Sequence, residues 1–109
     1  MSGKKVKVRH YQYLLSTFPE TMAAVESLGA TVREAGPLDN KTTELIQLAV
    51  AASAQSTGAV HSHTRRALAA GASKKEIEHA LLVLISTIGF PKVAAALAWI
   101  QEITDEASA

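Results

Sequence analysis

The chain has 109 residues, of which 48% are hydrophobic, with no cysteine and a formal net charge of +1. This length fits a single domain, the balanced charge excludes the basic surface of a nucleic-acid-binding protein, and the lack of cysteine excludes disulfides, thiolate metal sites and thiol catalysis. Because the hydrophobic residues are rich in alanine and only 5% of all residues are aromatic, we expect an all-α fold of about five helices.

The first segment, residues 4–17, mixes basic and apolar residues without a clean helical period. We expect it to form an arm that packs on a neighbouring chain. No apolar run of the signal-peptide type follows its basic residues, so we expect a cytoplasmic protein. Pro19 and Glu20 predict the start of a helix, because proline suits the first helical position and an acid favours the first turn. That helix should end near Ala35, since Pro37 disfavours helical backbone in the residue before it.

The middle of the chain predicts two helices with a short break between them. Asp39 is expected to cap the first of these helices, which then carries a broad apolar face. Residues 53–58 are small and polar enough to end it, and Ser56 or Thr57 is expected to cap the next helix. Gly71 should close that second helix in the left-handed conformation.

The last third of the chain begins with a capping-box pattern. Ser73 is followed three residues later by Glu76, which predicts a helix start, and the apolar residues that follow predict a helix as far as Ile88. Residues 80–100 are almost wholly apolar and long enough to cross a membrane, but the Gly-Phe-Pro sequence at 89–91 divides them. We therefore expect two buried helices and no membrane partner.

Two residues stand out as candidates for proton chemistry. Glu44 is expected early in its helix, where a solvated acid favoured by the helix dipole is the ordinary interpretation. The alternative is a general acid or base, because the apolar residues around it would remove water from the carboxylate. His63 on the next helix is either a histidine hydrogen-bonded in a crevice or the partner of Glu44 in catalysis. We take both as candidate catalytic residues.

Other polar residues near His63 are candidate ligands of a metal or a substrate. His61 and His63 are two residues apart, so on a helix they point in different directions and do not form an i, i+4 metal-binding pair. Ser56 is a candidate substrate-binding residue, with helix capping as the alternative. Arg65 and Arg66 are ordinarily solvated, but Arg66 is retained as a candidate for binding a substrate carboxylate. We expect neither a metal nor a cofactor.

Several short segments together resemble the carboxymuconolactone decarboxylase family, which includes the alkylhydroperoxidase D-like proteins. The resemblance implies an all-α domain over residues 18–106, preceded by the arm at 1–17 and followed by a tail at 107–109. It also implies a homo-oligomer, a trimer or hexamer, built through apolar helices. The segments that carry it are Leu38-Asp39, Glu44-Leu45-Ile46 with Leu48–Ala51, His63, Ala67–Ala72, Glu76-Ile77, and Gly89-Phe90-Pro91 with Ala94–Trp99.

The peroxidase branch of that family uses a glutamate, a C-x-x-C pair at a helix start, and a histidine four residues after the second cysteine. Glu44 and His63 match the glutamate and the histidine, but Ser56 and Ala59 stand in the two cysteine positions. Neither residue can be oxidised by a hydroperoxide, so peroxidase activity by that route is not expected. The decarboxylase branch works without the cysteines, which favours a cofactor-free lyase acting on a small carboxylated metabolite. The alternative is a non-catalytic scaffold or a small-molecule-binding homologue.

Overall fold

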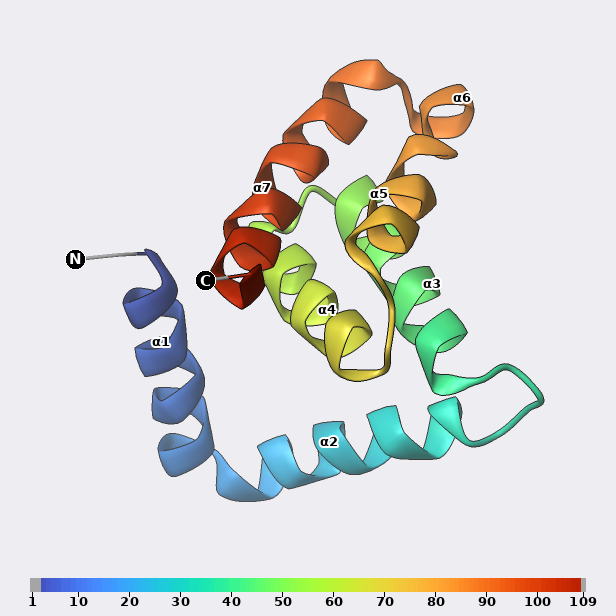
Figure 1. Cartoon of the computed structure of the whole chain (residues 1–109). Helices are drawn as coiled ribbons and strands as arrows, with labels where there is room; N and C mark the ends of the chain where they lie inside the picture. The colour runs from blue at the N-terminus through green and yellow to red at the C-terminus, as the bar shows by residue number, and fades with distance from the viewer. Residues whose placement is uncertain (1–2, 109) are drawn as a thin grey trace. The chain divides into compact units, whose positions relative to one another are not determined.

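The computed structural model describes the backbone of residues 3–108 and the side chains of residues 10–106. Within these residues the chain is helical and contains no strand, which confirms the all-α fold class (Figure 1). Residues 1–2 of the expected arm and residue 109 of the expected tail lie outside the described residues. The helices are α1 (Gly3–Thr17), α2 (Pro19–Arg33), α3 (Asn40–Ser53), α4 (Thr57–Ala69), α5 (Lys74–Leu82), α6 (Ile85–Ile88) and α7 (Phe90–Ser108).

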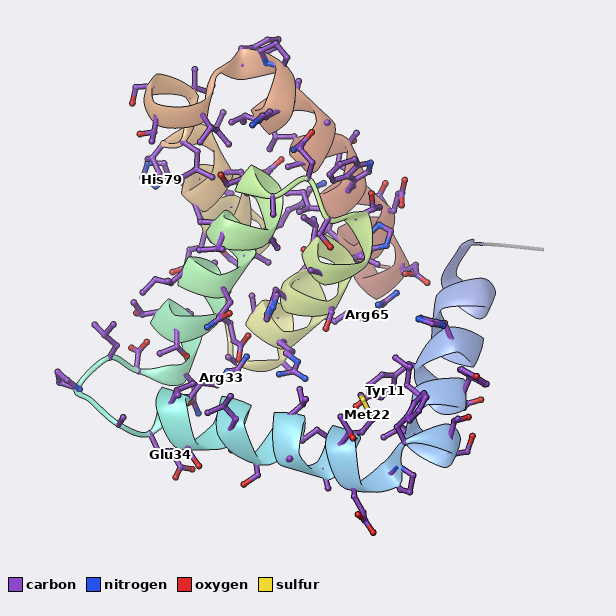
Figure 2. The ribbon with its side chains drawn as sticks, turned by 180° about the vertical axis from the view of Figure 1, so that it is seen from behind. Tyr11, Met22, Arg33, Glu34, Arg65 and His79 are labelled. Carbon is purple, nitrogen blue, oxygen red and sulfur yellow. The ribbon has the colours of Figure 1, made fainter. Side chains whose placement is uncertain are left out.

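Helices α1 and α2 form the first of two compact units, which ends at Pro37. The expected arm is a helix, and its contact with a neighbouring chain stays a prediction. Pro19 is at the start of α2 and Glu20 is in its first turn, as expected. The Tyr11 hydroxyl donates a hydrogen bond to Glu26 across the pair at 2.5 Å, and Figure 2 shows Tyr11 and Met22 on the facing sides of the two helices.

Helices α3 to α7 form the second unit, which begins at Leu38. Helix α4 packs against α3 and α7, and α5 also contacts both of those helices. The sequence folds this way because each helix buries an apolar face on a shared core. Several core residues are alanines, which let the helices approach closely. The core is made of Leu48, Ala51, Ala52, Val60, Ala67, Ala72, Ile77, Leu81, Val93, Ala96 and Ile100.

The helix starts and one helix end in the second unit follow the local sequence. The Asp39 carboxylate accepts a hydrogen bond from the backbone N–H of Thr42 at 2.7 Å and so caps α3. Ser73 and Glu76 form the expected capping box at the start of α5. Gly71 has a φ of 97°, the left-handed conformation that a residue with a side chain rarely adopts. These three predictions are confirmed.

The helix expected to run without a break to Ile88 is wrong, because α5 ends at Leu82 and the separate helix α6 begins at Ile85. Between them, the N–H of Leu84 donates to the carbonyl of Leu81 at 3.0 Å, a tighter i to i+3 turn than the α-helix makes. This break and the helical arm explain why the described residues hold seven helices rather than about five.

None of the helices in residues 3–108 combines the length and apolar character that crossing a membrane requires. The cytoplasmic location expected from the sequence stays a prediction.

Candidate functional site

Glu44 and His63 meet at the contact between α3 and α4. Glu44 is buried, with 8% of its side chain exposed, and its Oε1 lies 3.2 Å from Nδ1 of His63. The His63 side chain keeps 18% of its surface exposed. The structure therefore brings together the two candidate catalytic residues, as the sequence predicted, and leaves the histidine as the more accessible of the two. Their catalytic roles stay predictions.

The turn between α3 and α4 places these side chains opposite each other. Gln55 in this turn has a φ of 54°, in the left-handed region that is uncommon for residues other than glycine. Its side-chain amide donates hydrogen bonds to the carbonyl of Ala52 at 2.7 Å and to that of Lys92 at 3.2 Å. These bonds hold the turn in its unusual conformation and connect it to the start of α7.

The contact determines which ring nitrogen is available for chemistry. An ionised carboxylate can only accept hydrogen bonds, so Nδ1 of His63 is the donor when Glu44 is ionised. In the neutral imidazole this arrangement leaves the lone pair on Nε2, and the ring can take up or release a proton at that atom. The buried carboxylate orients the ring, in the way that a histidine is oriented in other acid–base sites.

The candidate substrate-binding residues lie on α4 with His63. Ser56 is the N-cap residue of α4 and is exposed, but among the described residues its hydroxyl accepts no capping hydrogen bond. Ser56 therefore stands at the N-cap position expected from the sequence, but its side chain does not make the capping hydrogen bond. Arg66 is exposed and follows His63 by three residues, which places it on a neighbouring part of the helix surface. The neighbouring Arg65 (Figure 2) instead forms an ion pair with Glu106 of α7 at 3.9 Å.

His61 has a partner that the sequence analysis did not identify. Its Nε2 lies 2.7 Å from Oε2 of Glu102 on α7, and its side chain is only 8% exposed. It therefore faces α7, whereas His63 faces α3, as their spacing predicts. Across the side chains described, no group of three or more His, Cys, Asp and Glu residues could hold a metal ion.

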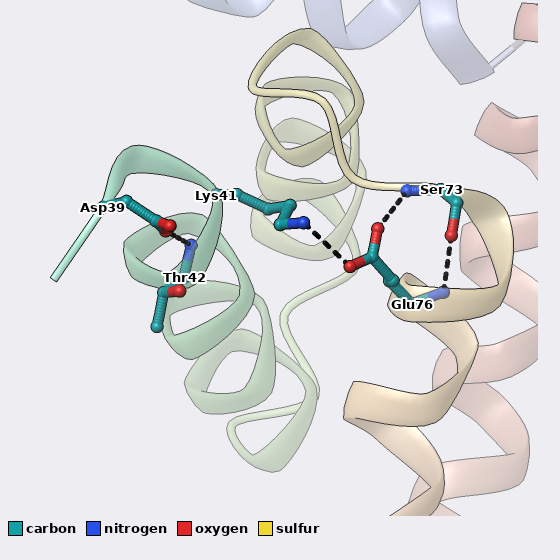
Figure 3. Close-up of polar contacts among 5 residues, drawn as sticks. All are labelled: Asp39, Lys41, Thr42, Ser73 and Glu76. Atoms are coloured by element: carbon teal, nitrogen blue, oxygen red, sulfur yellow. Dashed lines mark hydrogen bonds and ion pairs between the residues drawn. The ribbon is translucent and has the colours of Figure 1, made fainter.

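A second polar network joins the starts of α3 and α5 (Figure 3). Glu76 accepts hydrogen bonds from the Ser73 backbone N–H and from Nζ of Lys41, both at 2.9 Å. Both bonds lower the pKa of Glu76, and the bond from Ser73 has the larger effect. The bond to Glu76 raises the pKa of Lys41. The backbone N–H of Thr42 lowers the pKa of Asp39. Lys41 precedes Glu44 by less than one turn, so the network connects the part of α3 that carries Glu44 to the start of α5.

Comparison with known proteins identifies the family. The sequence profile of the carboxymuconolactone decarboxylase family matches residues 19–102, which include Glu44, His63 and most of the helices described. The chain belongs to the carboxymuconolactone decarboxylase family.

A solved member of this family has the same fold. The crystal structure of a carboxymuconolactone decarboxylase family protein from Legionella pneumophila, determined in its apo form, superposes with a TM-score of 0.78. The two sequences are 27% identical, and the match covers 92% of each chain. None of the curated proteins matches the sequence. The family resemblance inferred from the sequence is thus confirmed.

Proposed function

We propose that this member of the carboxymuconolactone decarboxylase family is a cofactor-free lyase that releases carbon dioxide from a small carboxylated metabolite. The observation that carries the proposal is the 3.2 Å contact between the buried carboxylate of Glu44 and Nδ1 of the more accessible His63. Such a pair is suited to acid–base catalysis, because one side chain fixes the ring while the other nitrogen meets the substrate.

The proposed reaction needs only a proton donor and a substrate that can delocalise negative charge. The bond between the carboxylate carbon and its neighbour breaks, carbon dioxide leaves, and the electron pair stays on the remaining carbon, delocalised into an adjacent lactone carbonyl. His63, protonated on both nitrogens, donates the Nε2 proton to that carbon. The ring keeps its Nδ1–H hydrogen bond to Glu44, and a proton from water restores the cation.

The surroundings of His63 support a carboxylated substrate. Arg66 is exposed three residues after His63, and a guanidinium binds a carboxylate through two parallel hydrogen bonds. Ser56 precedes His63 by seven residues, which is close to two helical turns, so it lies on the same side of α4 about 10 Å away. Its exposed hydroxyl is not used in capping and can bind the far end of a substrate.

The test is release of carbon dioxide from a panel of γ-lactone carboxylates and β-keto acids labelled in the carboxyl group. Wild type should release label from at least one of them, and His63→Gln should not. His79→Gln is the matched control, because His79 is an exposed histidine on α5 (Figure 2) and its loss should leave release unchanged. Equal release of labelled carbon dioxide by wild type and His63→Gln would refute the proposal. No release by any folded variant would favour a scaffold or small-molecule-binding homologue.

We also propose that the protein works as a homo-oligomer, a trimer or hexamer. Helix α2 has no buried residue, although Val25, Leu28 and Val32 recur on it at helical spacing and are each more than half exposed. The second unit also exposes Val50 and Phe90 by more than half. A short chain with this much exposed apolar surface is expected to cover it with further copies. Light scattering should give several times the chain mass of 11.5 kDa, and a monomer at micromolar concentration would contradict this.

A further inference from the structure

Helix α4 carries two histidines that contact different neighbouring helices. Nε2 of His61 lies 2.7 Å from Glu102 on α7, and Nδ1 of His63 lies 3.2 Å from Glu44 on α3. Because the two histidines are two residues apart, their side chains leave the helix about 200° apart. A single rotation of α4 about its axis therefore moves both rings, and the contact of His61 with α7 restrains the direction of His63.

Small rotations of α4 are enough to matter for the His63 contact. Side-chain atoms lie about 5 to 6 Å from a helix axis, so each ~10° of rotation moves them by about 1 Å. A donor–acceptor distance of 3.2 Å that grows by this amount no longer describes a hydrogen bond. The fully buried residues of α4 are Val60, Thr64 and Ala67, which are short side chains. They fix the position of the helix on the core.

The contact between α4 and α7 has a regular register. Arg65 forms an ion pair with Glu106 at 3.9 Å. Arg65 follows His61 by four residues on α4, and Glu106 follows Glu102 by four residues on α7. Glu106 lies in the last turn of α7, where the helix dipole disfavours negative charge, so a cation opposite it is stabilising. Of these two contacts, the one from His61 is the shorter, and the His61 side chain is only 8% exposed, although its partner Glu102 is 59% exposed.

We propose that His61, held by Glu102, is a positioning residue that sets the rotation of α4 and so directs Nδ1 of His63 toward Glu44. The inference deepens the proposed function, because it rests on the His63–Glu44 pair as the working site. His61 does not touch the substrate in this scheme. Its role is to keep the proton of the neutral His63 ring on Nδ1 and leave Nε2 for the reaction.

The experiment measures the tautomer of His63 directly and needs no substrate. Full-length protein labelled with 15N in histidine is examined by long-range proton–nitrogen correlation NMR, with the His63 signals assigned from His63→Gln. Wild type should hold its neutral His63 with the proton on Nδ1. In Glu102→Ala the ratio of tautomers should move toward that of the exposed His79. Glu102 is 59% exposed, so the change leaves no cavity.

Three further variants separate positioning from a general loss of stability. His61→Phe keeps a buried ring of similar shape without a polar atom, so the protein should fold while His63 shifts as in Glu102→Ala. Asp105→Asn is the matched control. It removes the ion pair between Asp105 and Lys74, whose charged atoms lie 3.8 Å apart, and Asp105 is on the same part of α7 as Glu102. It should leave His63 unchanged. Glu102→Gln keeps an acceptor for His61 and should restore the wild-type tautomer.

The outcomes distinguish this proposal from the proposed function. An unchanged His63 tautomer in Glu102→Ala and His61→Phe overturns the positioning role and leaves the lyase proposal standing. A shift of the same size in Asp105→Asn also overturns it, because any loosening of α7 would then suffice. If wild type itself lacks the Nδ1–H tautomer, the pairing of His63 with Glu44 is overturned, and both proposals fall with it.

Discussion

Replacing Glu44 by glutamine or by alanine separates its packing from its chemistry. Glutamine keeps the methylene groups and an oxygen that can accept the hydrogen bond from Nδ1 of His63. Alanine removes the outer methylene group and the accepting oxygen. The pair therefore compares a variant that preserves the orientation of His63 with one that abolishes it, at a residue that is only 6% exposed.

The size of the effect follows from what each variant removes. Glu44→Ala loses one buried methylene, worth about 0.8 kcal/mol. It also leaves the Nδ1–H of His63 without this acceptor, a loss of about 1 to 3 kcal/mol in a buried setting. The free energy of unfolding should fall by about 2 to 4 kcal/mol, which lowers Tm by about 8 to 16 °C in a chain of this size. Glu44→Gln should stay within about 1 kcal/mol of wild type, because its amide oxygen still accepts the hydrogen bond from His63.

The assay is thermal unfolding followed by circular dichroism, at one protein concentration because oligomers gain stability with concentration. Carbon dioxide release is measured on the same samples. Glu44→Gln should fold as well as wild type but lose turnover, because an amide does not replace the charge beside the ring. If Glu44→Ala unfolds within about 1 kcal/mol of Glu44→Gln, the buried contact with His63 does not exist in solution and the reasoning fails.

Three further predictions concern the thiol site, acid stability and the core. The wild type should show no thiol-dependent peroxidase activity, whereas Ser56→Cys with Ala59→Cys should create a dithiol with a lowered pKa at the start of α4; unshifted thiol pKa values would contradict the position of that helix start. Hydrogen bonds from Ser73 and then Lys41 lower the pKa of Glu76 from 4.5. The stabilisation linked to this carboxylate is therefore present above pH 4.5 and is lost as the pH falls through the lowered pKa. In Glu76→Gln the Tm should fall less steeply as the pH is lowered than it does in wild type. An equally steep fall would refute the contribution of Glu76 to acid stability. Leu48→Ala, at a fully buried core position, should cost about 2 to 5 kcal/mol by urea unfolding, and a cost under about 1 kcal/mol would place Leu48 outside the core.

The features that the sequence predicted well are those set by a few neighbouring residues. The cap at Asp39, the capping box of Ser73 and Glu76, and the left-handed Gly71 each depend on residues within one turn. Their physical cause is local, because each satisfies backbone groups that the helix end leaves unpaired. Short patterns in the sequence are therefore enough to locate them.

The features that escaped prediction depend on contacts or on small backbone changes. The break between α5 and α6 falls at Val83 and Leu84, where neither glycine nor proline interrupts the apolar pattern, and both residues keep helical angles. The helix over Gly3–Thr17 has no clean apolar period to reveal it. The α5–α6 break is a short change to i to i+3 hydrogen bonding, which residue type does not reveal.

The candidate site was predicted only in part. The residues alone suggested that Glu44 and His63 could be partners on successive helices, and the family resemblance added to this, because no local pattern fixes a contact between separate helices. The contact of His61 with Glu102 was missed for the same reason. One signal could have indicated it, since a basic pair at i, i+4 on α4, His61 and Arg65, faces an acidic pair at the same spacing on α7.

The central claim is that Glu44 and His63 act as one proton-handling unit, and a double-mutant cycle on the rate of carbon dioxide release tests it most directly. Glu44→Gln, His63→Gln and the double variant are compared with wild type on the same labelled substrate, after each is shown to be folded. Residues that act as a unit have strongly non-additive effects, so the double variant should be no slower than the slower single variant. Losses that multiply in the double variant would contradict the claim, because they would show that the two residues act independently.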